Sequence, residues 1–185
     1  MMTEVGAPEG SQGLWRSLAI GGTVVALALA LIWGGDSGTS EPVSRGVEAP
    51  DFELTELGSD TPIELSSLRG RVVLLNFWAT WCKPCEEEMP SMERLYRSLH
   101  PQGLELIAVS VDEDPSLVED FRDRMAVSFP IALDPDQEVS RLYQTRGFPE
   151  SLLLDRDGTV LERYVGPRNW VIYRDRIQKL VAADG

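Results

Sequence analysis

The chain has 185 residues, 43% of them apolar, and its 30 acidic and 17 basic side chains give a formal charge of −13. This length allows one domain of ordinary size with its own core, and a second domain is not expected. The strong negative charge disfavours nucleic acid and an anionic membrane surface as targets. There are only two cysteines, so the chain cannot be a scaffold held by several disulfides.

The N-terminal part of the chain predicts a membrane anchor. Residues 15–33 carry no charge after Arg16 and have a tryptophan at each end. A spanning helix needs roughly 20 apolar residues, and tryptophan favours the membrane interface. We therefore expect a cytoplasmic tail over 1–14 and one transmembrane helix over 15–33. A secretory signal is the alternative, because alanines recur at alternate positions in this stretch.

The segment after the predicted anchor has the composition of a flexible linker. Residues 34–49 are rich in Gly, Ser, Thr and Pro and show no apolar periodicity. The remaining residues, 50–185, alternate strand and helix patterns and are expected to form a single domain. Both interpretations of the N-terminus place this domain outside the cytoplasm. We expect a single-pass protein of the inner (cytoplasmic) membrane whose domain faces the periplasm or extracytoplasmic space.

The domain is predicted to be an α/β structure with a mixed sheet and helices on both faces. The apolar run Val72–Trp78, interrupted only by Asn76, predicts a central strand that is covered on both faces. In the helix that follows, apolar side chains recur at spacings of three and four residues, as on one face of a helix. These are Met89, Met92, Leu95, Tyr96 and Leu99.

Further elements follow from apolar periodicity, capping residues and turn signals. They are a strand over Leu104–Val111, a helix starting at Asp114-Pro115 with Leu117, Phe121 and Met125 on its apolar face, a short strand over Phe129–Leu133, a brief helix around Val139, Leu142 and Tyr143, strands over Ser151–Leu154 and Val160–Val165 joined by a turn at Asp155–Gly158, and a last helix with Trp170, Tyr173, Ile177, Leu180 and Val181 on one side.

The two cysteines stand in Trp81-Cys82-Lys83-Pro84-Cys85, between the predicted central strand and its helix. A cysteine at a helix N-terminus is stabilised as the thiolate by unpaired amide hydrogens and the helix dipole. Cys82 is therefore the expected nucleophile. Cys85 lies one turn further in and is placed to resolve a mixed disulfide by attacking Cys82. Trp81 is expected beside the sulfurs and partly exposed, and Pro84 restricts the loop without loss of a hydrogen bond.

Two other interpretations of the cysteine pair are weaker. A zinc site needs four ligands, and the only histidine, His100, lies at the far end of the helix. A structural disulfide between residues three apart closes a very short loop and constrains the unfolded chain little. No cofactor or metal is therefore expected.

These residues resemble a known family. The stretch from Val72 to Pro90, with Ser67–Arg71 before it and Gly147–Asp155 and the Asp157-Gly158 turn after it, is similar to membrane-anchored thioredoxin-like proteins of the TlpA, ResA and CcmG type. The resemblance covers about residues 48–182. It implies a thioredoxin fold with an N-terminal strand or hairpin extension and a central β-α insertion. It also implies an extracytoplasmic thiol reductase function, often in cytochrome c maturation.

The resemblance assigns roles to further residues. Pro149 matches the family's cis-proline, which lies beside the thiols, and the backbone of Phe148 before it aligns an extended substrate segment. Glu88 matches the acidic residue of a Cys-x-x-Cys-x-x-Glu arrangement, where it takes or relays the proton of the resolving thiol. Thioredoxins have a buried aspartate where Asn76 stands, and an amide cannot titrate, so Glu88 is the leading candidate for proton transfer. The alternative for Glu88 is a solvated residue in an acidic run.

The main hypothesis is a thiol-disulfide oxidoreductase that reduces disulfides in exported proteins such as apocytochrome c. The expected electron donor is a transmembrane thiol reductant of the CcdA/DsbD type. Glu86, Glu87, Glu88 and Glu150, which replaces the threonine common after the cis-proline, would destabilise a thiolate and favour reduction, whereas Lys83 acts in the opposite direction.

Two alternative functions are a non-enzymatic membrane-tethered binding module and a thiol peroxidase. Peroxiredoxins share the fold, but their Pro-x-x-x-Thr-x-x-Cys pattern is absent before Cys82, where Leu75 and Ala79 stand instead. Replacing Cys82 and Cys85 by Ser tests the binding module, because unchanged activity in cells would favour binding over redox chemistry. Peroxide consumption by the isolated domain would favour the peroxidase.

Overall fold

The computed structural model describes residues 43–59 and 61–183. The predicted tail over 1–14, the predicted span over 15–33 and most of the predicted linker lie outside these residues. Within the described part, no helix is both long and apolar enough to cross a membrane.

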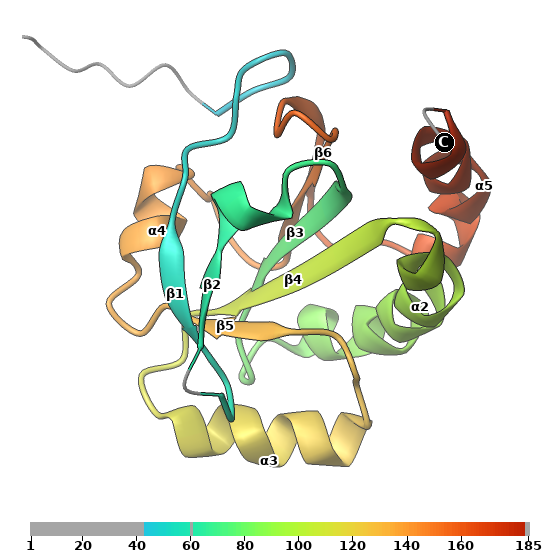
Figure 1. Ribbon diagram of the computed structural model, residues 1–185. Coiled ribbons are helices and arrows are strands. Elements are labelled where there is room, and N and C mark those ends of the chain that lie inside the picture. Colours follow the sequence, from blue (N-terminus) through green and yellow to red (C-terminus); the bar gives the residue numbers. More distant parts are fainter. Residues whose placement is uncertain (1–42, 60, 184–185) are drawn as a thin grey trace, which may run out of the picture. The chain divides into compact units, whose positions relative to one another are not determined.

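The elements follow in chain order and are shown in Figure 1. They are β1 (Glu53–Glu56), β2 (Pro62–Glu64), the 3-10 helix η1 (Leu65–Leu68), β3 (Val72–Trp78), α2 (Lys83–Leu99), the 3-10 helix η2 (His100–Gln102), β4 (Leu104–Ser110), α3 (Pro115–Met125), β5 (Ile131–Leu133), α4 (Glu138–Leu142), β6 (Glu150–Leu154), β7 (Val160–Val165) and α5 (Trp170–Ala182).

The strands of the described residues form one seven-stranded mixed sheet in the order β2-β1-β5-β4-β3-β6-β7. β3, β4 and β5 are parallel, whereas β6 pairs antiparallel with β3 and β7 pairs antiparallel with β6. The antiparallel hairpin β1–β2 extends the other edge by pairing with β5. The predicted α/β architecture with a mixed sheet is therefore confirmed, and the central strand has the predicted bounds.

Every residue of β3 is buried, because both faces of the sheet are covered. Leu74 and Trp78 belong to a core shared with α2, α3 and α5, whereas Leu75 and Phe77 belong to a second core on the other face, which α4 and η1 cover. Figure 1 shows α2 and α5 together on one side of the sheet and α4 on the other. The sheet thus places the start of α2 at the carboxyl end of a rigid central strand.

Two helix faces differ from those predicted by periodicity. In α3 the buried residues are Val118 and Phe121, and Leu117 is half exposed. In α4 the side chain of Val139 is buried, whereas Leu142 is exposed. Leu117 and Val118 both lie at helical spacing from Phe121, so the pattern allows either face. Packing against the sheet selects Val118.

Residues 43–49, which composition assigns to the predicted linker, are bound to the domain. Val43 is buried, the Gly46 amide donates to the Val160 carbonyl at 2.8 Å, and the Val160 amide donates to the Val47 carbonyl at 2.9 Å. The Ala49 amide also donates to the Gly158 carbonyl at 2.9 Å. This segment therefore lies along the start of β7.

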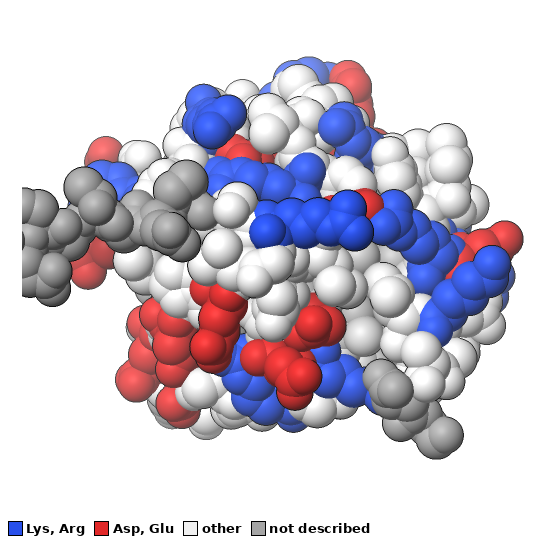
Figure 2. All heavy atoms as spheres, turned by 90° about the horizontal axis from the view of Figure 1, so that it is seen from above, with Lys and Arg blue, Asp and Glu red and all other residues white. Residues whose placement is uncertain are grey.

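Charge is distributed unevenly over the domain. Figure 2 views it from above Figure 1, where Lys and Arg side chains form a stripe across the end of the sheet at which β3 begins. At this end Arg69 binds Glu48 at 2.7 Å, and Arg156 donates to the Val181 carbonyl at 2.7 Å. Cys82 follows the other end of β3. The basic stripe and the cysteine pair therefore lie at opposite ends of this strand.

Candidate active site

Cys82 is the N-cap residue of α2. Its backbone is extended (φ −86°, ψ 97°), and its sulfur accepts a hydrogen bond from the Cys85 amide at 3.3 Å. The first amides of a helix lack intrahelical partners, and they favour a negative charge together with the helix dipole. The position therefore favours the thiolate form of Cys82 when the pair is reduced.

Cys82 and Cys85 form a disulfide with an S–S distance of 2.08 Å and a Cα–Cα distance of 5.2 Å. Cys82 is 6% exposed, whereas Cys85 is completely buried. An attacking or incoming sulfur therefore reaches Cys82 first. The difference in exposure is what a nucleophilic cysteine followed by a resolving cysteine requires.

The loop before Cys82 is held by a buried aspartate that the sequence analysis did not identify. Asp112 follows β4 and is 3% exposed. Its carboxylate accepts hydrogen bonds from the Thr80 amide at 2.9 Å, from the Thr80 hydroxyl at 2.6 Å and from the Ser110 hydroxyl at 2.8 Å. Its position after a buried strand parallel to β3 is a signal that could have found it, because the carboxyl ends of parallel strands meet at one edge of a sheet.

The residues predicted to bind substrate gather around the disulfide. Trp81 is 69% exposed, and its ring lies 5.9 Å from the ring of Phe148 in an edge-to-face arrangement. The Phe148-Pro149 peptide bond is cis, as the resemblance implies. Pro149 is buried and Pro84 is exposed in the first turn of α2. The cysteine turn and the proline loop therefore meet through the Trp81–Phe148 contact, with an apolar surface open to solvent.

Glu88 lies one turn beyond Cys85 in α2 and is 3% exposed. Its Oε1 accepts a hydrogen bond from Asn76 Nδ2 at 2.9 Å, and its Oε2 accepts one from the Arg168 amide at 2.9 Å. Asn76 Nδ2 also donates to the Ser151 hydroxyl at 2.9 Å. The structure therefore joins the strand position of Asn76 to Glu88, and Glu88 is a buried residue rather than a solvated one.

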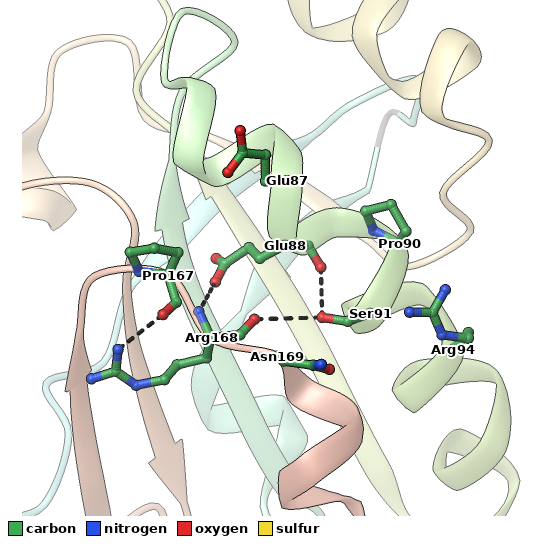
Figure 3. A pocket seen from close by; sticks show the side chains of 8 residues that line it. All are labelled: Glu87, Glu88, Pro90, Ser91, Arg94, Pro167, Arg168 and Asn169. Carbon is green, nitrogen blue, oxygen red and sulfur yellow. Dashed lines mark hydrogen bonds between the residues drawn. The ribbon is translucent and has the colours of Figure 1, made fainter.

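Burial raises the pKa of the Glu88 carboxyl above its ordinary value, and the hydrogen bonds from Arg168 and Asn76 only partly oppose this shift. A pocket of about 310 Å³ lies beside this residue. Figure 3 shows its lining residues, between α2 and the loop that leads into α5. Ser91 borders it and donates to the Glu88 carbonyl at 2.8 Å. A carboxyl with a raised pKa next to both a buried thiol and a surface pocket is suited to proton transfer.

Two of the other carboxylates expected to destabilise a thiolate, Glu86 and Glu150, are compensated. Glu86 binds Lys83 at 3.2 Å and Arg124 at 2.8 Å, and hydrogen bonds from these two residues lower its pKa. Glu150 is completely buried on the face of the sheet away from α2 and is paired with Arg163. The expectation that Glu150 adds uncompensated negative charge near the thiols is therefore wrong. Glu87 remains exposed.

The described residues contain no group of three or more His, Cys, Asp or Glu side chains arranged to hold a metal ion. His100, the residue considered for a zinc site, lies at the far end of α2. There its Nδ1 is 3.1 Å from Arg71 Nη2.

A redox-active disulfide at the start of a helix, next to a cis-proline loop on a mixed sheet, defines the class of thioredoxin-like thiol-disulfide oxidoreductases. Residues 45–163 match the model of the AhpC/TSA family. The chain belongs to this family, and its relatives identify it as a thiol-disulfide oxidoreductase of the ResA/CcmG type.

Among curated relatives, thiol-disulfide oxidoreductase ResA of Bacillus thuringiensis (strain Al Hakam) is 43% identical over 126 residues, which cover 68% of this chain and 72% of the relative. ResA of Bacillus subtilis (strain 168) is 39% identical over 126 residues, covering 68% and 70%. Among solved structures, a putative thiol:disulfide interchange protein DsbE from Chlorobium tepidum is 33% identical with a TM-score of 0.68, covering 76% of this chain and 97% of that one.

Proposed function

We propose that this chain is a membrane-tethered, extracytoplasmic reductase of disulfides in exported proteins such as apocytochrome c. The observation that carries the proposal is the Cys82–Cys85 disulfide at the start of α2, with Cys82 6% exposed and Cys85 completely buried. The predicted span over 15–33 supports the location outside the cytoplasm. The residues that act are Cys82, Cys85 and Glu88, with Trp81 and the Phe148-Pro149 segment at the substrate surface.

The reaction proceeds in two exchange steps from the reduced pair. The Cys82 thiolate attacks one sulfur of the substrate disulfide, which breaks that bond, forms a mixed disulfide and releases the first substrate thiolate. The Cys85 thiolate then attacks the Cys82 sulfur, re-forms the Cys82–Cys85 disulfide and releases the second substrate thiolate. Two electrons pass from the cysteine pair to the substrate, and Glu88 takes the proton of Cys85. A membrane thiol reductant of the CcdA/DsbD type then returns the pair to the dithiol.

Fewer negative charges favour the reducing direction than the sequence alone indicates. Glu86 is compensated by Lys83 and Arg124, so it contributes little negative charge to the thiols. Glu88 lies in the next turn after Cys85 and its hydrogen-bond donors are neutral groups. Negative charge at this carboxylate disfavours a thiolate next to it, and a less stabilised reduced form is a stronger reductant.

An equilibrium titration of the domain against glutathione tests the direction. We expect a reduction potential near that of thioredoxin, about −270 mV, and a value near about −120 mV, as in a dedicated oxidant, would contradict the proposal. Labelling Cys82 in intact cells with a membrane-impermeant maleimide tests the location. Labelling that appears only after the cells are lysed would place the domain in the cytoplasm.

A further inference from the structure

A buried ion pair lies directly behind the substrate-binding loop. Glu150 follows Pro149, is completely buried and pairs through its Oε1 with Nε of Arg163, whose side chain is 18% exposed. The two residues are diagonal neighbours on β6 and β7, because the register pairs Leu152 with Arg163. Removing two charges from water is costly unless further hydrogen bonds satisfy the remaining donors and acceptors.

The remaining donors of Arg163 bind the start of the loop that carries the cis-proline. Nη1 donates to the Tyr143 carbonyl at 3.0 Å, and Nη2 donates to the Gln144 carbonyl at 2.8 Å. Nη1 also donates to the carbonyl of Val43 at 2.8 Å, near the beginning of the described chain. The planar guanidinium group thus holds two segments that are distant in sequence, and a lysine could not reproduce these bonds in the same geometry.

The second oxygen of Glu150 binds the middle of the same loop. Oε2 accepts a hydrogen bond from the Arg146 amide at 2.7 Å. Beyond the loop, the Gly166 amide donates to the Pro149 carbonyl at 2.9 Å. Residues 143–149 are therefore fixed at their start by Arg163, in the middle by Glu150 and at their end by Gly166, which follows β7.

We propose that Glu150 and Arg163 are positioning residues for thiol-disulfide exchange. Their ion pair holds the 143–149 loop so that the ring of Phe148 stays beside Trp81 and the backbone of Phe148 aligns an extended segment of a protein substrate against Cys82. The inference rests on the proposed substrate-binding role of this loop. It also explains the departure from the threonine that is common in the family, because threonine at position 150 could not reach both Arg163 and the Arg146 amide.

Loss of the ion pair is expected to affect the reduction rates of two kinds of substrate differently. A peptide with an internal disulfide needs the loop backbone to be aligned, whereas hydroxyethyl disulfide needs only access to Cys82. Loss of the ion pair should therefore slow the first reaction and spare the second. A pair that serves only folding would affect neither reaction in a variant that folds.

The test uses the double variant Glu150→Leu/Arg163→Leu, because replacing both members of a buried pair with apolar residues is often tolerated. We expect kcat/KM for a short disulfide-containing peptide to fall about 10-fold or more, since small displacements of an aligned substrate are costly. The rate with hydroxyethyl disulfide should change by less than about 2-fold. The reduction potential should stay unchanged. Glu48→Leu/Arg69→Leu, which removes an exposed ion pair at the other end of the sheet, is the matched control.

Equal peptide reduction by the double variant and the unmodified protein would overturn the proposal, as would an equal loss of both rates. A wild-type domain that equilibrates with glutathione but leaves the peptide oxidised would instead contradict the proposed function. If the double variant does not fold, Arg163→Lys supplies the test, because it retains the positive charge and loses the planar set of carbonyl bonds. The same split between the two substrates is expected.

Discussion

Two buried glutamates of this domain lie on opposite faces of the sheet and are held by different kinds of group. Glu88 accepts hydrogen bonds from the Asn76 amide and from the backbone N–H of Arg168, and both donors are electrically neutral. Glu150 is bound by the guanidinium of Arg163, which carries a permanent positive charge. The first carboxyl lies in the helix of the cysteine pair, and the second lies behind the proline loop.

The difference separates a group suited to proton transfer from a group suited to positioning. A carboxyl held by neutral donors in a buried site changes its charge without leaving a cation unpaired, and its pKa is raised by burial. Removing the carboxylate from a buried ion pair leaves the charge of its partner buried and unpaired, which destabilises the protein. Burial of an acidic residue next to an active site therefore does not by itself indicate catalysis.

The largest expected effect is on stability and concerns the ion pair. Arg163→Leu leaves Glu150 as a buried, unpaired carboxylate, so we expect the free energy of unfolding to fall by about 3–5 kcal/mol. Urea unfolding of the oxidised domain measures it. The exposed counterpart Arg69→Leu should change stability by less than about 1 kcal/mol. Similar losses in the two variants would remove the distinction between a buried and a surface pair.

The next effect concerns the rate of exchange and Glu88. Glu88→Gln keeps the size of the side chain but cannot take a proton, so we expect the resolving step to slow about 100-fold. Rapid-mixing measurements with the reduced domain and a peptide disulfide follow this step. Glu87→Gln, an exposed neighbour in the same helix, is the control and should leave the rate nearly unchanged. A normal rate in Glu88→Gln would assign proton transfer to another group.

A smaller effect is expected in the pH dependence of stability. Because the folded state raises the pKa of Glu88 above 4.5, it binds more protons than the unfolded state between the two pKa values. The contribution of Glu88 to stability is therefore greatest at low pH and declines as the pH rises through this window. Glu88→Gln should remove the decline, so the variant gains stability relative to the wild type as the pH rises above 4.5. The free energy of unfolding in urea is measured for both proteins as a function of pH. The same pH dependence in the two proteins would contradict the raised pKa of Glu88.

The smallest effect is expected at Glu86, which is partly exposed and compensated. Glu86→Gln removes its bonds with Lys83 and Arg124, and such surface pairs contribute little. The exchange rate should change by less than about 2-fold, with no measurable change in the glutathione equilibrium. A clear shift of that equilibrium would show that the helix-start charges do tune the thiols.

Much of the architecture was predictable because it depends on local patterns. The bounds of β3, the amphipathic face of α2 and the β6–β7 turn follow from unbroken apolar runs, helical spacing and a glycine at positive φ. The packed face of α3 was less predictable, because Leu117 and Val118 are adjacent and the choice depends on the sheet that the helix meets. Tertiary packing, rather than periodicity, decides between such neighbours.

The active-site residues could also largely be predicted from the sequence, whereas the residues that hold them in place could not. Cys82, Cys85, Glu88 and Pro149 belong to recognisable motifs, although their roles in the reaction stay predictions. The Glu150–Arg163 pair joins residues whose contact depends on the register of two strands. The predicted strand begins at Ser151 and therefore leaves Glu150 out of the hairpin, and the register shifts between Leu153 and Leu154. Asp112 depends on the parallel pairing of β3 and β4, which composition alone does not give.

The central claim is that Cys82 attacks a substrate disulfide and Cys85 resolves the product. Trapping with Cys85→Ser tests it most directly, with mass spectrometry of the species linked to the protein. We expect a stable mixed disulfide between Cys82 and a cysteine of an exported protein, and none with Cys82→Ser. Trapping on Cys85 in Cys82→Ser, with nothing bound to Cys82 in the other variant, would contradict it.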